Sequence, residues 1–303
     1  MNVSEPQATR VTHTSDRSGR AALNTATVKH ASLAEACEAA ATAGFGAVGP
    51  WRNVVQDVGA ERAARIIADA GLRASSLCRG GFLTAADDAG IRSALDDNKL
   101  AIEEAATIGT TELVFVVGGL PGSTPGGAPA SDVDRDLVGT RGRVADRIAD
   151  LVPFAAEHGV RIVLEPLHPI FAADRAVIST LAQALDLAAP FAASEVGVVV
   201  DTYHVWWDPA LRKSIARAGR EDRIASYQVC DWVLPLAAEP LNSRGHVGDG
   251  YIDFATITGW VRDAGYVGDI ETEIFNEEIW ARPTAETAAT VLSRYEKHVA
   301  PHL

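Results

Sequence analysis

Two stretches of the sequence decide the fold: RIVLEPLHP, residues 161–169, and VGVVVDTYH, residues 196–204. Each begins with a short run of β-branched and other apolar residues, and each run ends in a carboxylate, Glu165 in the first stretch and Asp201 in the second. Runs of this kind indicate buried strands. An amphipathic helical pattern lies between them, so the two stretches indicate successive strands joined by a helix.

The same unit recurs on both sides of this pair. An apolar run is followed by a polar or glycine-containing turn, an amphipathic helix and a glycine before the next run. Ser32 and Glu35 have the spacing of a capping box at the start of the first helix, and Gly44 stands where that helix would end. Eight such units close a (β/α)8 barrel. The runs cover residues 23–27, 45–48, 72–76, 112–117, 161–164, 196–200, 224–229 and 269–274.

This pattern predicts an α/β protein with a single (β/α)8 TIM barrel over residues 22–303. Residues 1–21 are polar and rich in Ser and Thr, and they lack helical or strand periodicity, so we expect a flexible N-terminal tail. A doubly wound open sheet is the competing fold. No GxGxxG follows the first run, and the absence of this dinucleotide-binding fingerprint favours the barrel.

Composition excludes several classes of function. The 303 residues are 47% hydrophobic and 22% charged, which is typical of a globular protein with a large core. The net charge of -13 has the wrong sign for nucleic acid as a partner. No apolar run is long enough for a membrane helix and no secretory signal is evident, so we expect no membrane partner and a cytoplasmic location. Cys37, Cys78 and Cys230 form no CxxC pair, and we expect them to be reduced and packed.

Four strand ends carry oxygen ligands. Site residues of a barrel come from the carboxyl ends of its strands, which here offer Glu165, Asp201, Gln228 and Glu273. Glu271 faces the same side as Glu273, but Glu273 lies nearer the carboxyl end. Three converging carboxylates repel one another unless one takes up a proton or a cation binds. The oxygen-only set favours Mn²⁺ or Mg²⁺ over zinc.

Histidines also follow the strand ends. His168 and His204 each stand three residues after one of the carboxylates, where they could contact substrate or orient a ligand. We assign both as candidate catalytic residues. Arg244 and His246, in the turn SRGHVGDG (residues 243–250), are candidate substrate-binding residues. A solvated or purely structural role is the alternative for each histidine.

Two basic and two aromatic residues complete the candidate substrate-binding set. Lys29 follows the first run and Arg79 follows the third, so both are expected to point to the barrel mouth and to bind substrate oxygens or an anionic group. Trp51 and Trp207 also follow strand ends, and sugars and aromatic ligands pack on such rings. Aromatic side chains that fill space beneath loops, or that form an oligomer contact, would give the same pattern.

Five motifs in order resemble one known family. From about residue 23 to its end, the chain is similar to the xylose-isomerase-like barrels called sugar phosphate isomerases/epimerases. The resemblance is carried by LEPLHP (164–169), VDTYHVWWDP (200–209), YQVCDW (227–232), GHVGDGYIDF (245–254) and GDIETEIFNE (268–277).

The resemblance implies a metal site and its ligands. In that family a Glu, an Asp, a His or Gln, and a Glu at these strand ends bind one divalent metal, usually Mn²⁺. By this likeness the ligands here are Glu165, Asp201, Gln228 and Glu273. Many relatives have His where this chain has Gln228, although hydroxypyruvate-isomerase-like members also use Gln. This departure bears on which metal is bound more than on whether one is bound.

The resemblance also implies a function in carbohydrate metabolism. We expect a metal-dependent sugar isomerase or epimerase in which Glu165 and Glu273 remove and return a proton next to a carbonyl, through a metal-bound enediolate. The alternative is a lyase that cleaves 3-oxo-C-glycosides by elimination, as C-glycoside deglycosidases in the family do, often with a small second subunit. A sugar-binding barrel without catalysis is a third hypothesis. The expected partners are a small-molecule sugar or glycoside and further copies of the chain in a homo-oligomer.

Overall fold

A computed structural model of the chain describes residues 18–121 and 132–303. Residues 1–17 of the predicted tail lie outside the described residues. The predicted boundary at residue 22 differs from the structure, because Ser18–Arg20 form a short 3-10 helix (η1) and the first strand begins at Ala21. Arg20 explains the difference: its Nε donates to the backbone oxygen of Gly268, 2.9 Å away, and joins this segment to the end of the barrel.

Nine described strands form one parallel sheet in the order β3-β2-β1-β11-β8-β7-β6-β5-β4. The first and last strands of this sheet along the chain, β1 and β11, are neighbours and pair in parallel. The strands are β1 (Ala21–Asn24), β2 (Ala47–Gly49), β3 (Arg73–Ala74), β4 (Leu77–Gly81), β5 (Glu112–Val116), β6 (Arg161–Leu164), β7 (Val196–Asp201), β8 (Ile224–Val229) and β11 (Ile270–Thr272). A separate antiparallel pair, β9 (Asp231–Trp232) and β10 (Arg244–Gly245), follows β8.

The third barrel position is divided between two strands, which differs from the single strand predicted over residues 72–76. Ser75 and Ser76 separate β3 from β4, and both hydroxyls donate to Glu271 Oε2, at 2.6 and 2.9 Å. Successive side chains of a strand point to opposite faces, so Ser75 and Ser76, which both reach Glu271, cannot belong to one regular strand. A parallel bridge between Trp51 and Cys78 brings β4 against the segment after β2 and closes the ring.

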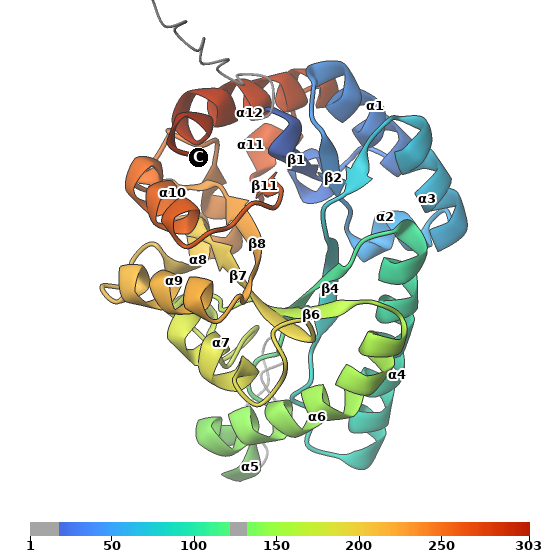
Figure 1. The fold of residues 1–303 in the computed structure, drawn as a ribbon, viewed down its shortest axis with the longest axis vertical. Coiled ribbons are helices and arrows are strands. Elements are labelled where there is room, and N and C mark those ends of the chain that lie inside the picture. Colours follow the sequence, from blue (N-terminus) through green and yellow to red (C-terminus); the bar gives the residue numbers. More distant parts are fainter. Residues whose placement is uncertain (1–17, 122–131) are drawn as a thin grey trace, which may run out of the picture.

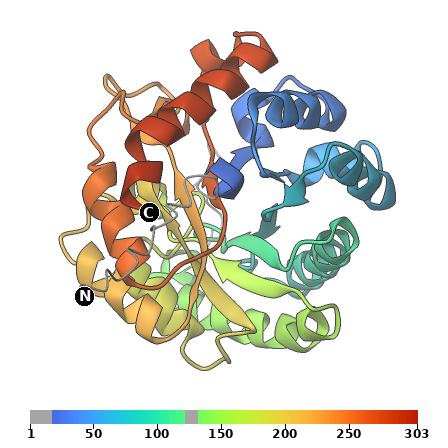
Figure 2. The same cartoon turned by 45° about the horizontal axis from the view of Figure 1, so that its top comes forward.

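Helices surround the strands, as Figures 1 and 2 show. This arrangement confirms the predicted (β/α)8 barrel and excludes the open doubly wound sheet. The described helices are α1 (Leu33–Ala43), α2 (Arg52–Gln56), α3 (Ala60–Asp69), α4 (Asp88–Ile108), α5 (Asp132–Arg135), α6 (Leu137–Glu157), α7 (Leu181–Ala188), α8 (Thr202–Val205), α9 (Leu211–Arg220), α10 (Phe254–Asp263), α11 (Glu277–Trp280) and α12 (Thr284–His298).

The predicted limits of the first helix are confirmed. The Ser32 hydroxyl accepts from the backbone nitrogen of Glu35 at 3.3 Å, and the Glu35 carboxylate accepts from the backbone nitrogen of Ser32 at 2.8 Å. Gly44 ends α1 with a φ of 107°, a left-handed conformation that costs glycine little. Local signals therefore predict where α1 begins and ends.

The inner face of the barrel carries the site. Cys78, Val114, Val163 and Val199 form a small apolar cluster of their own, separate from the large core between strands and helices. Side chains alternate along a strand, so Glu165 and Asp201, two residues after Val163 and Val199, continue the same inner face toward the carboxyl ends. The inside of the barrel is thus apolar at these four residues and polar at the carboxyl ends of the strands.

Cys37, Cys78 and Cys230 are buried and form no disulfide, as predicted. In the described part of the chain, none of the helices combines the length and the apolar character that crossing a membrane requires.

Candidate active site

Four neighbouring strands deliver the candidate ligands. Asp201 is the last residue of β7 and lies opposite Gln228 of β8 in the strand register. Glu165 follows β6 directly, and Glu273 follows β11. Because β6, β7, β8 and β11 are adjacent in the sheet, the structure brings these side chains to one end of the barrel. The three carboxylate residues are almost completely buried, with exposed fractions of 6%, 0% and 4% for Glu165, Asp201 and Glu273.

Arg244 supplies positive charge inside this cluster. Its Nη1 lies 3.0 Å from Glu273 Oε2 and 3.2 Å from Asp201 Oδ2, and it also donates to the backbone oxygen of Glu273. The guanidinium is buried with the carboxylates it contacts. One cation therefore faces three carboxylates, and the described cluster keeps an excess of negative charge.

Burial raises the pKa of all three carboxyl groups. For Glu165, burial acts together with the charges of Asp201 and Glu273, and the pKa lies well above its usual range. Burial also raises the pKa of Asp201, although Arg244 acts in the opposite direction. It raises the pKa of Glu273 to about 7, again against the effect of Arg244. The cluster therefore favours an added proton or an added cation.

His204 is buried beside the carboxylates and is held neutral. Burial, together with the nearby Arg244, lowers its pKa well below the usual range. The backbone nitrogen of His168 donates to Nδ1 at 3.1 Å, and Arg244 Nη2 lies 2.9 Å from Nε2. A neutral imidazole has one lone pair, so it can accept only one of these two donors at a time. His204 Nε2 also lies 3.9 Å from oxygens of both Glu165 and Asp201.

The donor set fits a divalent cation. Potential ligand atoms of Glu165, Asp201 and His204 all lie within 4.8 Å of one another. Gln228 Oε1 is buried and has no hydrogen-bond partner among the described residues. A buried carbonyl oxygen without a donor is unusual, and a bound cation would satisfy it. His204, predicted as a catalytic residue, thus lies among the potential ligands, whereas Glu273 accepts from Trp51 Nε1 at 2.9 Å and pairs with Arg244.

Glu271 orients the Gln228 amide. Gln228 Nε2 lies 3.4 Å from Glu271 Oε1, which also accepts from Asn24 Nδ2 at 2.6 Å. The other carboxylate oxygen accepts from Ser75 and Ser76. Since Glu271 faces the amide nitrogen, the amide oxygen is the atom left for a cation. The choice of Glu273 over Glu271 as the outer residue agrees with this arrangement.

A cavity of about 180 Å³ opens above the cluster. Trp51 and Arg79, predicted to bind substrate, lie in its wall, as does Arg244. Arg79 belongs to β4 and not to a loop after the third strand, because the strand continues to Gly81. The lining residues are Trp51, Cys78, Arg79, Phe82, Val116, Glu165, Leu167, Arg175, His204, Leu241, Arg244, Glu273 and Phe275.

Three residues that the sequence predicts for the site do not line this cavity: Lys29, His168 and Trp207. The His168 ring packs against Trp232 with 4.7 Å between ring centroids. Trp207 donates from Nε1 to the backbone oxygen of His204, at 2.8 Å. Lys29 is exposed, and its ammonium lies 4.1 Å from the centre of the Trp280 ring. His168 and Trp207 thus support His204 from outside the cavity, whereas Lys29 packs elsewhere.

His246 lies in a second cavity of about 440 Å³ near α12, together with Asp249 and Asn276. Its Nδ1 is buried without a hydrogen-bond partner among the described residues. The structure therefore separates His246 from Arg244, although the two are only two residues apart.

Sequence reasoning missed Arg175 and Phe275 in the cavity wall. Arg175 follows the short 3-10 helix Pro169–Phe171 and is held by Glu239, 3.1 Å from its Nη2. No periodic pattern marks such a loop position. Phe275 could have been found from its place, two residues after Glu273 on the same strand end.

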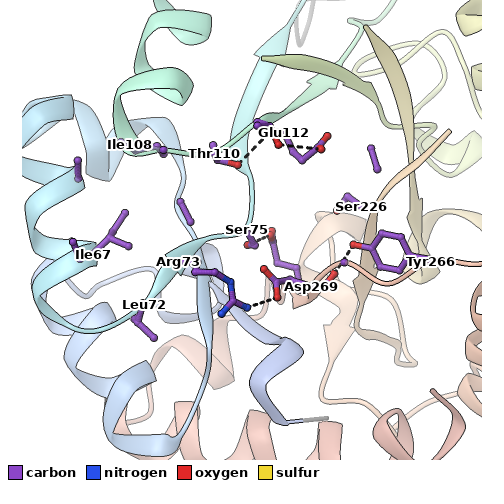
Figure 3. Close-up of a pocket in the computed structure, with 18 residues that line it drawn as sticks. Ile67, Leu72, Arg73, Ser75, Ile108, Thr110, Glu112, Ser226, Tyr266 and Asp269 are labelled. Carbon is purple, nitrogen blue, oxygen red and sulfur yellow. Dashed lines mark hydrogen bonds and ion pairs between the residues drawn. The ribbon is translucent and has the colours of Figure 1, made fainter. Parts of the chain in front are cut away.

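A further cavity of about 450 Å³ lies at the opposite end of the barrel, where the strands begin (Figure 3). Arg73 and Asp269 form an ion pair there at 2.6 Å, and Glu112 lies across from them. Ser75 in this cavity donates to Glu271, whose other carboxylate oxygen faces Gln228. Glu271 therefore lies between this cavity and the carboxylate cluster.

Comparisons with known proteins agree with this architecture. A protein of known structure from Sinorhizobium meliloti 1021, SMc04130, is 40% identical to the chain, with a TM-score of 0.86 over 92% of this chain and 98% of that one. IolI protein with a zinc atom is 19% identical, with a TM-score of 0.76 over 94% and 99%. L-ribulose 3-epimerase is 20% identical, with a TM-score of 0.73 over 93% and 95%. The last two likenesses show the fold alone.

A segment of 162 residues is 30% identical to 3-dehydroshikimate dehydratase of Pseudomonas aeruginosa. This match covers 52% of the chain and 24% of the dehydratase, so the chain spans about a quarter of that relative. Residues 37–295 match the xylose isomerase-like TIM barrel family. The matched region includes the whole carboxylate cluster and its cavity, and the chain belongs to the xylose isomerase-like TIM barrel family.

Proposed function

We propose that the chain is a metal-dependent enzyme that removes a proton next to the carbonyl of a small hydroxylated substrate and returns it, as a sugar isomerase or epimerase does. The observation that carries this proposal is a cluster of three buried carboxylates, Glu165, Asp201 and Glu273, which contacts a single buried guanidinium. Glu165 and Glu273 line the cavity above the cluster, and Asp201 lies beneath them. A cluster that only stabilises the fold would gain nothing from such an excess of buried negative charge.

Glu165 is the better placed base. Among the described residues its carboxylate accepts no N–H hydrogen bond: His204 Nε2 is 3.9 Å away, and its hydrogen-bonding neighbour is the carboxyl group of Asp201. Its side chain lines the cavity, so a substrate C–H could approach it directly. A carboxylate in a largely apolar cavity is a strong proton acceptor, because burial disfavours its charged form.

Glu273 is suited to the other side of the substrate. Its two oxygens face Trp51 Nε1 and Arg244 Nη1, which fix the plane of the carboxyl group. A carboxyl group held in this way can hold a proton and return it in one defined direction. Two carboxyl groups on one cavity, Glu165 without an N–H donor in the described structure and Glu273 fixed by two donors, suit a reaction in which a proton leaves and another is added.

Glu165, Asp201, His204 and Gln228 are the residues that would hold a divalent cation, with Glu273 as a further oxygen donor beside them. When bound, such an ion supplies Lewis-acid stabilisation of the negative charge that develops on a substrate carbonyl oxygen. A zinc atom in the structural neighbour IolI supports a divalent metal, while the oxygen-rich donor set favours Mn²⁺ or Mg²⁺.

Elimination is the second candidate function. The 30% identity with 3-dehydroshikimate dehydratase favours it, because loss of water next to a carbonyl also requires that a proton be removed. The same base would serve both reactions, and the substrate decides between them. A leaving group β to the carbonyl makes the chain a lyase, and its absence makes the chain an epimerase or isomerase.

The test is incubation of metal-loaded protein in D₂O with a panel of keto-sugars and of carbonyl compounds that carry a β leaving group. Deuterium next to the carbonyl of an epimerised or isomerised sugar supports the first function, and release of the leaving group supports the second. Failure of every substrate to exchange or eliminate, with Mn²⁺, Mg²⁺ and Zn²⁺ each supplied, would contradict both.

A further inference from the structure

Arg79 is a cation without a counter-ion in the wall of the catalytic cavity. Among the described residues, no carboxylate lies within ion-pair distance of its guanidinium and no hydrogen bond is made by it, although it shares the cavity with Glu165 and Glu273. Arg175 also lines the cavity, but it is already paired with Glu239 and Asp174. The two arginines thus differ: the positive charge of Arg79 is free, whereas that of Arg175 is balanced.

Two aromatic rings hold the Arg79 guanidinium in place. It lies 4.0 Å from the centre of the Phe82 ring and 5.5 Å from that of Trp51. Contacts of this kind occupy the faces of the guanidinium and leave its N–H groups available for a hydrogen-bond acceptor. Since the side chain is held before a ligand arrives, binding costs less conformational entropy.

The backbone after Arg79 is shaped to place the Phe82 ring. Phe82 has a φ of 55°, a left-handed conformation that is rare for a bulky residue. Gly81 precedes it with a φ of 109°, and a Cβ there would clash with the backbone oxygen of Val116. Asn98, completely buried in α4, holds Gly81 from both sides, accepting from its nitrogen at 2.7 Å and donating to its oxygen at 2.8 Å. Disfavoured conformations that are held this firmly are concentrated at functional sites.

The charge balance of the cavity leaves Arg79 for the substrate. Arg244 and one divalent cation would together offset the three carboxylates of the cluster. With the cluster neutral, Arg79 is the charge that remains in a cavity whose other walls include Val116, Leu241 and Phe275. In such surroundings a guanidinium binds an anion more strongly than it would in water.

We propose that Arg79 forms a subsite for an anionic group, a carboxylate or a phosphate, so that the natural substrate is an acidic hydroxylated carbonyl compound. The subsite rests on the proposed function in one respect: the substrate occupies the cavity above the carboxylate cluster. It adds the chemical class of the substrate, because a neutral sugar leaves Arg79 without a partner.

Binding of three matched ligands to Mn²⁺-loaded protein tests this subsite by isothermal titration calorimetry. Glucitol is neutral, gluconate adds a carboxylate, and glucitol 6-phosphate adds a phosphate. We expect at least one anion to bind roughly 10- to 100-fold more tightly than glucitol, the usual range for a charge-assisted contact. Which anion gains more distinguishes a carboxylate from a phosphate subsite.

Variants distinguish binding of the anion by Arg79 from direct binding of the anion to the metal. Arg79→Gln should remove most of the preference for the anion, and Arg79→Lys should keep part of it because the charge remains. Arg73→Gln, at the opposite end of the barrel, is the matched control and should bind all three ligands as the wild type does (Figure 3). Circular dichroism confirms that each variant is folded.

Two outcomes would overturn the subsite. One is equal affinity of the wild type for glucitol and both anions, or no binding of either anion at millimolar concentrations. The other is an unchanged preference for the anion in Arg79→Gln, which would show that the anion binds to the metal and not to Arg79. Neither outcome affects the deuterium experiment, and a failed deuterium experiment leaves these affinities unchanged, so the two proposals fail separately.

Discussion

Arg244 Nη1 lies 3.0 Å from Glu273 Oε2, and both side chains are buried, with exposed fractions of 2% and 5%. The two residues come from different elements, since Arg244 belongs to the β9 and β10 pair and Glu273 follows β11. The same nitrogen also approaches Asp201 at 3.2 Å. The antiparallel pair beside the barrel therefore delivers the one buried cation that the carboxylate cluster contacts in the described structure.

Arg244→Met should destabilise the metal-free protein strongly. Removing one partner of a buried ion pair typically costs about 3–5 kcal/mol, because the remaining charge is left uncompensated. Arg73→Met breaks an ion pair whose arginine is 58% exposed, and it should cost about 1 kcal/mol or less. Urea unfolding in EDTA measures both. Added Mn²⁺ should recover part of the loss in Arg244→Met, and equal effects of the two substitutions would contradict the role given to Arg244.

Metal content should follow the ligands and not the overall charge. Purified protein dialysed against Mn²⁺ should contain about one equivalent by elemental analysis. Asp201→Ala should lose it, since Asp201 is completely buried within the cluster. Asp269→Ala removes the same charge at the other end of the barrel and should keep the metal.

Gln228→His should also retain the metal, because an imidazole is an acceptable ligand. The test is the same elemental analysis, with the Mn²⁺ and Zn²⁺ contents compared after dialysis against both. A histidine should shift the preference toward Zn²⁺. Loss of all metal in Gln228→His would show that the amide has a role other than ligation.

Alkaline pH should destabilise the protein through Cys37. Burial raises the pKa of this thiol to about 11 from a usual value of 9.0. The folded state therefore disfavours the thiolate: the stability from the neutral thiol is complete below pH 9 and is lost as the pH rises from about 9 to 11, at about 1.4 kcal/mol per pH unit. Melting temperatures at pH 8 to 11 should fall less steeply in Cys37→Ala. Parallel curves for the two proteins would contradict the assignment.

The sequence allows much of the barrel to be predicted, because its strands and helix caps depend on local chemistry. The runs that end in Glu165 and Asp201 form β6 and β7, and Ser32 with Gly44 delimit α1. The divided third strand was not predicted. Ser75 and Ser76 bond to Glu271, almost 200 residues away, and no local pattern shows such a partner.

The site was predictable where strand ends determine it and unpredictable where loops do. Glu165, Asp201 and Glu273 meet because parallel strands end at one face of the barrel. Lys29 also follows a strand, yet its flexible side chain packs on Trp280 outside the cavity. Arg175 lies in a loop, where sequence carries no periodic signal, and its place depends on Glu239.

Deuterium exchange in two matched variants tests the central claim most directly. Glu165→Gln and Glu273→Gln keep an oxygen for the metal and remove the proton acceptor, so each should retain metal and lose about 10²- to 10⁴-fold in exchange rate. The measurement is the rate at which deuterium enters the carbon next to the carbonyl, by mass spectrometry, in metal-loaded wild type and both variants. The proposed function predicts rapid exchange in the wild type and this loss in both variants. Exchange that continues at the wild-type rate in both variants, with the metal retained, would contradict it.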